Sequence, residues 1–263
     1  MDLNIALMAF IIFRSAAAVS VPSHIWDFRG CSGTFLVDAF SSLTATFLNG
    51  ATCSFTGIVL DGNDDYVDID DWEWGGATSI EAYVKFESFN RYSNVIDFGT
   101  GASNNIRLAN FATSSSIGWW VLQGSTGKGI VTSNFDSSTR THVVVTVKNT
   151  TMKVYKHCVL VGTKTERFEP NIMTRTNHWL GRSPWTDNVY NGYFHGTIAY
   201  VKIWHGIELT DSDAAALYAL RDGCTSQPTP APSSSTSITS NPTIDCPNAI
   251  TGVGVSKEDL QHF

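Results

Sequence analysis

Between residues 25 and 222 the sequence is a succession of short segments in which apolar and polar residues alternate, separated by turn residues. The clearest segment, 79–86, alternates strictly, which predicts a strand with one apolar face. That face consists of Ile80, Ala82, Val84 and Phe86. Further strands are predicted at 95–98, 105–109, 117–123, 142–148, 152–155, 159–163, 178–180 and 197–204. Regular short strands without intervening helices predict an all-β fold, a two-sheet antiparallel jelly-roll sandwich.

The C-terminal part of the chain changes character. Residues 211–220 are rich in Ala and follow Thr210, a good N-cap, so one short helix is predicted there. Residues 225–248 are dominated by Ser, Thr and Pro, which cannot bury enough apolar surface to fold, and predict a disordered linker. Residues 249–263 are interpreted as a tail or as the start of an incomplete module. The predicted jelly-roll domain therefore covers residues 25–222.

The composition and the N-terminus favour a secreted protein. An apolar run at 5–13 followed by small residues near Ala18 predicts a signal peptide over residues 1–18, because the run is too short to span a bilayer. Asn149 begins an N-glycosylation sequon in a predicted turn. The formal net charge of −7, without any Lys/Arg cluster, argues against a nucleic-acid partner.

Five cysteines fit an oxidising compartment and match no metal-binding spacing. Cys31 and Cys53 flank the first strand-turn unit and are the favoured disulfide pair. A second pair, Cys224 with Cys246, would close a loop across the linker. Cys158 is our candidate for the odd cysteine.

The segment 59–69, with sequence VLDGNDDYVDI, places a tight turn between two predicted strands. Calcium prefers several oxygen ligands on an irregular loop, and this turn supplies them. The candidate ligands are Asp61, Asn63, Asp64 and Asp65. The alternative is that Asp61-Gly62 only shapes the turn, while the other carboxylates are solvated or cap backbone amides.

Several segments, in this order, resemble the laminin-G-like members of the concanavalin A-like lectin/glucanase superfamily. They are 59–67, 79–86, 141–147, 152–156, 180–183 and 192–204. The resemblance implies two antiparallel sheets packed face to face, with ligands at loop edges or on the concave face. The chain departs from the family pattern at Lys156-His157-Cys158, where a turn usually has Asn-Gly, and at Ala199, where an acidic residue is common. Ala199 removes one cation ligand of the family type.

The functional prediction is a secreted, non-catalytic binding module for an extracellular glycan or glycoprotein. Flat aromatic rings stack on sugars, and the candidates are Trp119, Trp185, Tyr190 and Tyr193. One alternative is a retaining glycoside hydrolase that uses Asp68 and Glu73, because the segment 68–73 resembles the acidic strand of glucanases on this fold. A second alternative is a structural or adhesion module of a surface protein.

Overall fold

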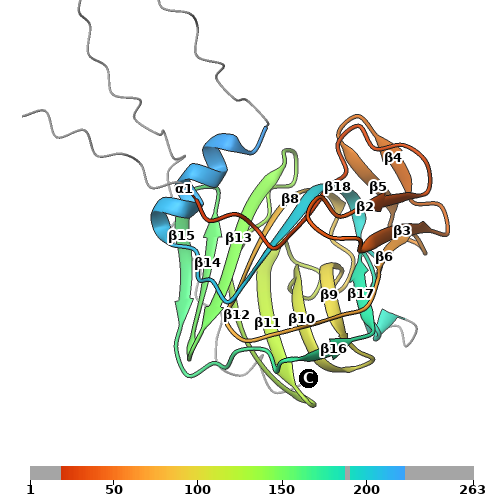
Figure 1. Ribbon diagram of the computed structural model, residues 1–263. Coiled ribbons are helices and arrows are strands. Elements are labelled where there is room, and N and C mark those ends of the chain that lie inside the picture. Colours follow the sequence, from red (N-terminus) through yellow and green to blue (C-terminus); the bar gives the residue numbers. More distant parts are fainter. Residues whose placement is uncertain (1–18, 187–189, 223–263) are drawn as a thin grey trace, which may run out of the picture.

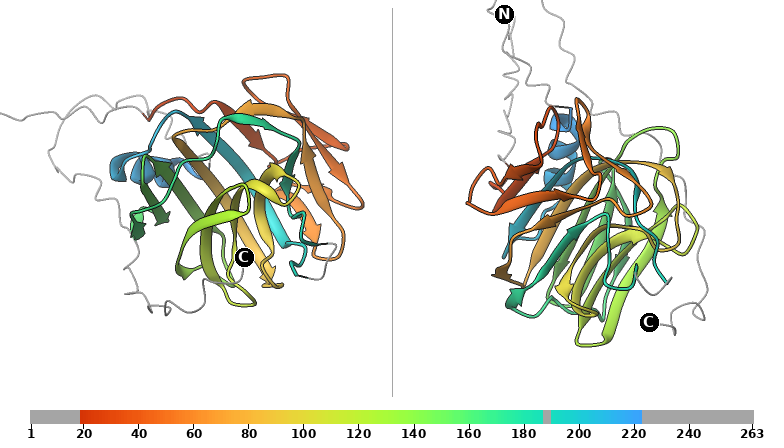
Figure 2. Two further views of the ribbon diagram at one scale, coloured as in Figure 1. Left: turned by 90° about the horizontal axis from the view of Figure 1, so that it is seen from below. Right: turned by 90° about the vertical axis from the view of Figure 1, so that its right-hand side faces the viewer.

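The computed structural model describes residues 19–186 and 190–222, which form two large antiparallel sheets packed face to face (Figures 1 and 2). Sheet A has eight strands: in spatial order β15 (Val159–Lys164), β14 (Thr151–Lys156), β13 (Thr141–Lys148), β8 (Thr78–Ser88), β18 (His195–His205), β5 (Gly57–Asp61) and β4 (Thr52–Ser54), with β1 (His24–Asp27) also paired to β18. Sheet B has eight strands: β12 (Thr126–Asn134), β11 (Ser116–Gln123), β10 (Ser103–Asn110), β9 (Asn94–Thr100), β17 (Asn177–Leu180), β6 (Tyr66–Ile69), β3 (Thr44–Leu48) and β2 (Phe35–Val37). A third, two-stranded sheet pairs β16 (Met173–Arg175) with β7 (Trp72–Trp74).

This architecture confirms the predicted jelly-roll sandwich. Strand β8 buries the four apolar residues that its alternation assigned to one face, and all four lie in the core between the two sheets. The domain limits at 25 and 222 stay predictions. The signal peptide, the linker and the tail lie outside the described residues.

Helix α1 (Asp211–Leu220) begins and ends as predicted and lies on sheet A (Figure 1). Thr210 and Asp213 form a capping box, in which each side chain accepts from the other residue's backbone N–H. The helix then buries Ala214 and Leu217 against apolar side chains of sheet A, including Val144. Among the described residues no helix is long and apolar enough to cross a membrane.

The predictions made for the cysteines are confirmed only in part. Cys31 and Cys53 form a disulfide with their Cα atoms 5.4 Å apart, as favoured from the sequence. Cys158 is also disulfide-bonded, so its assignment as the odd cysteine is wrong. The turn before it needs no glycine, because His157 itself takes a positive φ of 55°. Cys224 and Cys246 lie outside the described residues.

Candidate functional site

The outer face of sheet B, which points away from the core, carries one continuous row of side chains. In an antiparallel sheet, residues directly opposite each other share a face. The strand register places seven residues opposite one another in turn. From β11 to the edge strand β2 they are Trp120, Arg107, Asp97, Trp179, Asp68, Thr46 and Phe35. The row brings together aromatic and charged groups from seven strands of sheet B.

The half of this row on β9, β10 and β11 is covered. Arg107 and Asp97 are buried and paired, with Nε 3.2 Å from Oδ2, and the guanidinium carbon lies 4.7 Å from the ring centre of Trp185 in the loop after β17. The indole of Trp120 lies flat on the sheet. A Cβ added at Gly118 or Gly129 would come within 1.8 or 2.0 Å of it, so these positions require glycine.

Burial raises the pKa of Asp97 to about 6, although Arg107 and hydrogen bonds from Asn105 and Ser183 oppose the rise. The Asn105 amide donates to Oδ1 over 2.6 Å. Ser183 belongs to the loop after β17, so Asp97 also ties this loop to the sheet. The covered half is therefore closed to a ligand, because Trp120, Arg107 and Asp97 are all buried.

The other half of the row is accessible and, together with Tyr66 on the same face of β6, forms what we call the platform: Phe35, Thr46, Tyr66, Asp68 and Trp179. Phe35 is 56% exposed, Thr46 is exposed, and the other three are half-buried. The rings of Tyr66 and Trp179 meet edge to face with centres 6.1 Å apart. Their strand neighbours Val67, Ile69 and Leu180 are in the core, which fixes both rings on the outer face. The platform combines flat apolar rings with hydrogen-bonding groups, the usual composition of a small-molecule site.

Asp68 is the carboxylate of the platform. Its pKa is raised, mainly by burial and further by the nearby charges of Asp71 and Asp70. A hydrogen bond from Trp179 and the charge of Arg182 act in the opposite direction. The guanidinium of Arg182 lies 4.5 Å from the Trp179 ring centre and 4.8 Å from that of Tyr66. It therefore braces both rings at one side of the platform.

The four aromatic residues proposed from the sequence do not form this platform. Trp119 is fully buried between the sheets, so the prediction that it contacts a ligand is wrong. Adjacent strand residues point to opposite faces, and here it is Trp120 that points outward. Trp185 is half-buried over Arg107, Tyr193 is half-buried, and Tyr190 is 62% exposed. The last three all belong to the loop after β17.

Sequence reasoning missed Phe35, Tyr66, Trp179 and Arg182. A signal for two of them was present, because Tyr66-Val67-Asp68-Ile69 and His178-Trp179-Leu180 alternate in the same way as the strand at 79–86. The pairing of these two strands, which makes their outward residues neighbours, is not visible in the sequence.

The two carboxylates of the hydrolase alternative are on different sheets. Asp68 is on β6 of sheet B, whereas Glu73 is exposed on β7, opposite Thr174 of β16. Retaining catalysis needs two carboxyl groups about 5 Å apart across one cleft. The pair was suggested because glucanases on this fold carry both carboxylates on one strand, whereas Asp68 and Glu73 lie on two different strands. The geometry therefore does not favour hydrolysis by Asp68 and Glu73.

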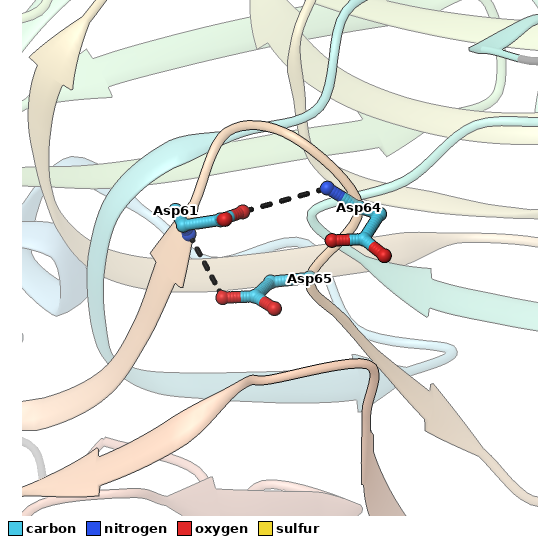
Figure 3. A group of neighbouring side chains, drawn as sticks. All are labelled: Asp61, Asp64 and Asp65. Atoms are coloured by element: carbon cyan, nitrogen blue, oxygen red, sulfur yellow. Dashed lines mark hydrogen bonds between the residues drawn. The ribbon is translucent and has the colours of Figure 1, made fainter.

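The acidic turn brings carboxylate oxygens of Asp61, Asp64 and Asp65 within 4.8 Å of one another (Figure 3). The turn's own N–H groups already use several of these oxygens. Asp61 accepts from the backbone N–H and the side-chain amide of Asn63, each at 2.8 Å, and these bonds lower its pKa. Asp65 accepts from the backbone N–H of Asp61 at 3.1 Å, and burial raises its pKa. The donor set suits calcium, but a self-supporting turn explains the same contacts, so calcium binding stays a prediction.

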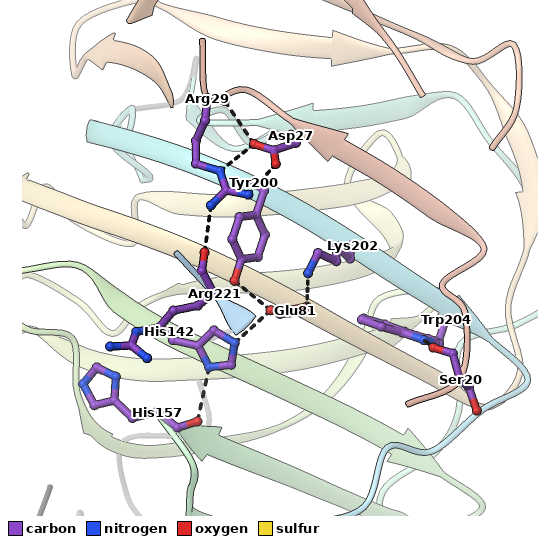
Figure 4. Close-up of polar contacts among 10 residues, drawn as sticks. All are labelled: Ser20, Asp27, Arg29, Glu81, His142, His157, Tyr200, Lys202, Trp204 and Arg221. Carbon is purple, nitrogen blue, oxygen red and sulfur yellow. Dashed lines mark hydrogen bonds and ion pairs between the residues drawn. The ribbon is translucent and has the colours of Figure 1, made fainter. Parts of the chain in front are cut away.

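The outer face of sheet A carries a buried polar network around Glu81 (Figure 4). Buried Glu81 accepts from Tyr200 at 2.7 Å and from His142 at 2.9 Å, and its second oxygen lies 2.9 Å from Nζ of Lys202. Burial alone would raise the pKa of Glu81, yet His142 and Lys202 hold it below its usual range. Tyr218 of α1 packs on His142, with ring centres 5.6 Å apart. This network holds the helix on the sheet.

Two stacked antiparallel sheets of eight strands each form a jelly-roll sandwich. The chain belongs to the concanavalin A-like lectin/glucanase superfamily, whose laminin-G family model matches residues 61–215. The comparison with curated protein sequences gives no match.

Solved structures with this fold include carbohydrate-related proteins. Domain 4 of AbnA, a GH43 extracellular arabinanase from Geobacillus stearothermophilus solved in complex with arabinotriose, has 18% identity and a TM-score of 0.60; the match covers 76% of this chain and 100% of that one. A Trypanosoma rangeli sialidase has 15% identity and a TM-score of 0.59, with 78% of this chain and 34% of the sialidase covered. The chain thus spans about a third of the sialidase. At such identities the likeness shows the fold alone.

Proposed function

We propose that this protein is a non-catalytic saccharide-binding module and that the platform on sheet B is its binding surface. The observation that carries the proposal is the strand register, which sets Trp179, Asp68 and Phe35 in one row on an accessible face. A sugar ring can stack its CH face on an aromatic ring while its hydroxyls donate to a neighbouring carboxylate. The solved complex of the arabinanase domain with arabinotriose supports this class of ligand.

The setting that we propose is extracellular. Two observations support it: the Cys31–Cys53 disulfide and the second bonded cysteine, Cys158. Asn149 lies exposed in the two-residue turn between β13 and β14, at a φ of 53°, where an attached glycan would meet no core side chain. The natural partner in this proposal is an extracellular glycan or glycoprotein.

Replacing Trp179 tests the proposal. The full chain and its Trp179→Ala variant would be applied to a glycan array, and each hit would be titrated by calorimetry. Loss of the ring should weaken binding about tenfold or more, as is usual for a central aromatic contact. Phe55→Ala is the matched control, because Phe55 is 89% exposed at the β4–β5 turn and lies outside the platform.

Two outcomes would count against the proposal. An array without any hit would favour the structural or adhesion module instead. Binding that survives in Trp179→Ala, while the variant's melting temperature stays near that of the parent, would move the binding surface elsewhere.

A further inference from the structure

The charges around the platform are unevenly distributed. Asp68 lies within it, and Asp70 and Asp71 follow at the end of β6, both exposed. Arg182 is the cation whose field reaches Asp68, and it is held against the rings of Tyr66 and Trp179. Among the described residues, three carboxylates stand against one guanidinium on this surface, which makes it negative, in a chain whose formal net charge is already −7.

The carboxylate of Asp68 retains hydrogen-bonding capacity toward a ligand. An ionised carboxylate offers about four acceptor sites and no donor. Trp179, its cross-strand partner, supplies one hydrogen bond. The free lone pairs can accept from a sugar hydroxyl, or more strongly from a sugar ammonium, because a charge-assisted hydrogen bond is about twice as strong as a neutral one. They can only repel a ligand carboxylate or sulfate.

Asp70 and Asp71 reinforce this selectivity. Asp70 uses one oxygen to accept from the backbone N–H of Thr44 at 2.7 Å, which fixes its charge beside the strands that form the platform. Like charges a few ångströms apart near a protein surface weaken binding by roughly tenfold for each close pair. A ligand anion seated on the platform would face these carboxylates together.

We propose that the platform accepts uncharged or amino-bearing saccharides and rejects saccharides that carry carboxylate or sulfate groups. This inference rests on the proposed function, since it names the ligand class of the same surface. The selectivity is electrostatic, so it should weaken as salt is added, whereas stacking on the rings should not.

Three short oligosaccharides with similar pyranose backbones would test the proposal by calorimetry on the full chain. Chitotriose is uncharged, its fully de-N-acetylated form is cationic, and a hyaluronan tetrasaccharide is anionic. At neutral pH and low salt we expect the cationic trimer to bind about tenfold more tightly than chitotriose, and the anionic ligand at least about tenfold more weakly.

Variants that each remove one charge show which residues cause the selectivity. Asp68→Asn keeps the shape of the side chain and should reduce the cationic preference to about twofold or less. Asp71→Asn leaves Asp68 in place and should reduce the preference about two- to threefold, with neutral binding unchanged. Arg182→Gln removes the opposing cation and should weaken anionic binding further.

The outcomes separate this inference from the proposed function. If all three oligosaccharides fail to bind and a glycan array also gives no hit, the proposed function fails. If the anionic ligand binds at least as tightly as chitotriose, or if Asp68→Asn and Asp71→Asn leave the order of affinities unchanged, only the charge selectivity is overturned.

Discussion

Each sheet carries one buried carboxylate on its outer face, and the two are stabilised differently. Glu81 on sheet A has three partners, including one cation at 2.9 Å, and its pKa is held below the usual range. Asp97 on sheet B faces Arg107, which is itself buried, and burial raises the pKa of Asp97 to about 6. The same residue class therefore has opposite pKa directions on the two faces of one sandwich.

The two outer faces also differ in what covers them. On sheet A the helix and its neighbours exclude water, and every strand around Glu81 contributes a donor, so the network serves the fold. On sheet B the loop after β17 covers one half of the row and leaves the other half accessible. Polar groups next to an open aromatic surface remain available to a ligand.

The largest expected effect is on sheet A. Glu81→Gln removes the charge that compensates Lys202, and it should lower the free energy of unfolding by about 3 kcal/mol, because one member of a buried ion pair is lost. Chemical denaturation would measure this. The matched variant Glu87→Gln breaks an exposed pair with Lys85 and should cost less than about 1 kcal/mol. Equal effects of the two variants would contradict the structural role of the network.

The second prediction uses the raised pKa of Asp97. Its folded-state pKa of about 6 exceeds the unfolded value of 3.8, so the folded state binds more protons between these values. The contribution of Asp97 to stability is full below pH 3.8 and is lost as the pH rises through about 6. Between pH 7 and 4.5 this contribution grows by about 2 kcal/mol, and Asp97→Asn should lack that gain. If the free energies of unfolding of the parent protein and of Asp97→Asn change with pH in parallel, the raised pKa of Asp97 is refuted.

The third prediction concerns the exposed end of the row on sheet B. Phe35→Ala should weaken saccharide binding about three- to tenfold and change the melting temperature little, because the ring is 56% exposed. Glu81→Gln should leave the affinity unchanged at a temperature where it is folded. If Phe35→Ala binds saccharides with the affinity of the parent protein, the binding surface does not extend to β2.

The smallest expected effect concerns the acidic turn. Asp61→Ala removes hydrogen bonds that close the turn and should cost about 1 kcal/mol, whether or not calcium is present. Thermal unfolding with millimolar calcium or with a chelator would separate the two interpretations. A calcium-dependent rise in melting temperature that disappears in Asp61→Ala would establish a cation site.

Local sequence patterns determined much of the fold. Alternation predicted the central strands, because a half-buried strand must place every second residue in the core. The helix was predicted with its N-cap because capping is decided by residues three apart. Strands such as β2, β4 and β7 were missed, since three residues are too few to show a period.

The site depended on tertiary structure. The sequence by itself supplied the aromatic and acidic side chains and the alternation that turns Tyr66, Asp68 and Trp179 outward. Only the pairing of β6 with β3 and β17 made Asp68 a neighbour of Thr46 and Trp179, and only the pairing of β17 with β9 placed Trp179 beside Asp97. Only the path of the later loop decided which outer-face residues are covered. Alternation fixes the face of a side chain, whereas contacts between distant segments fix its neighbours and its access to water.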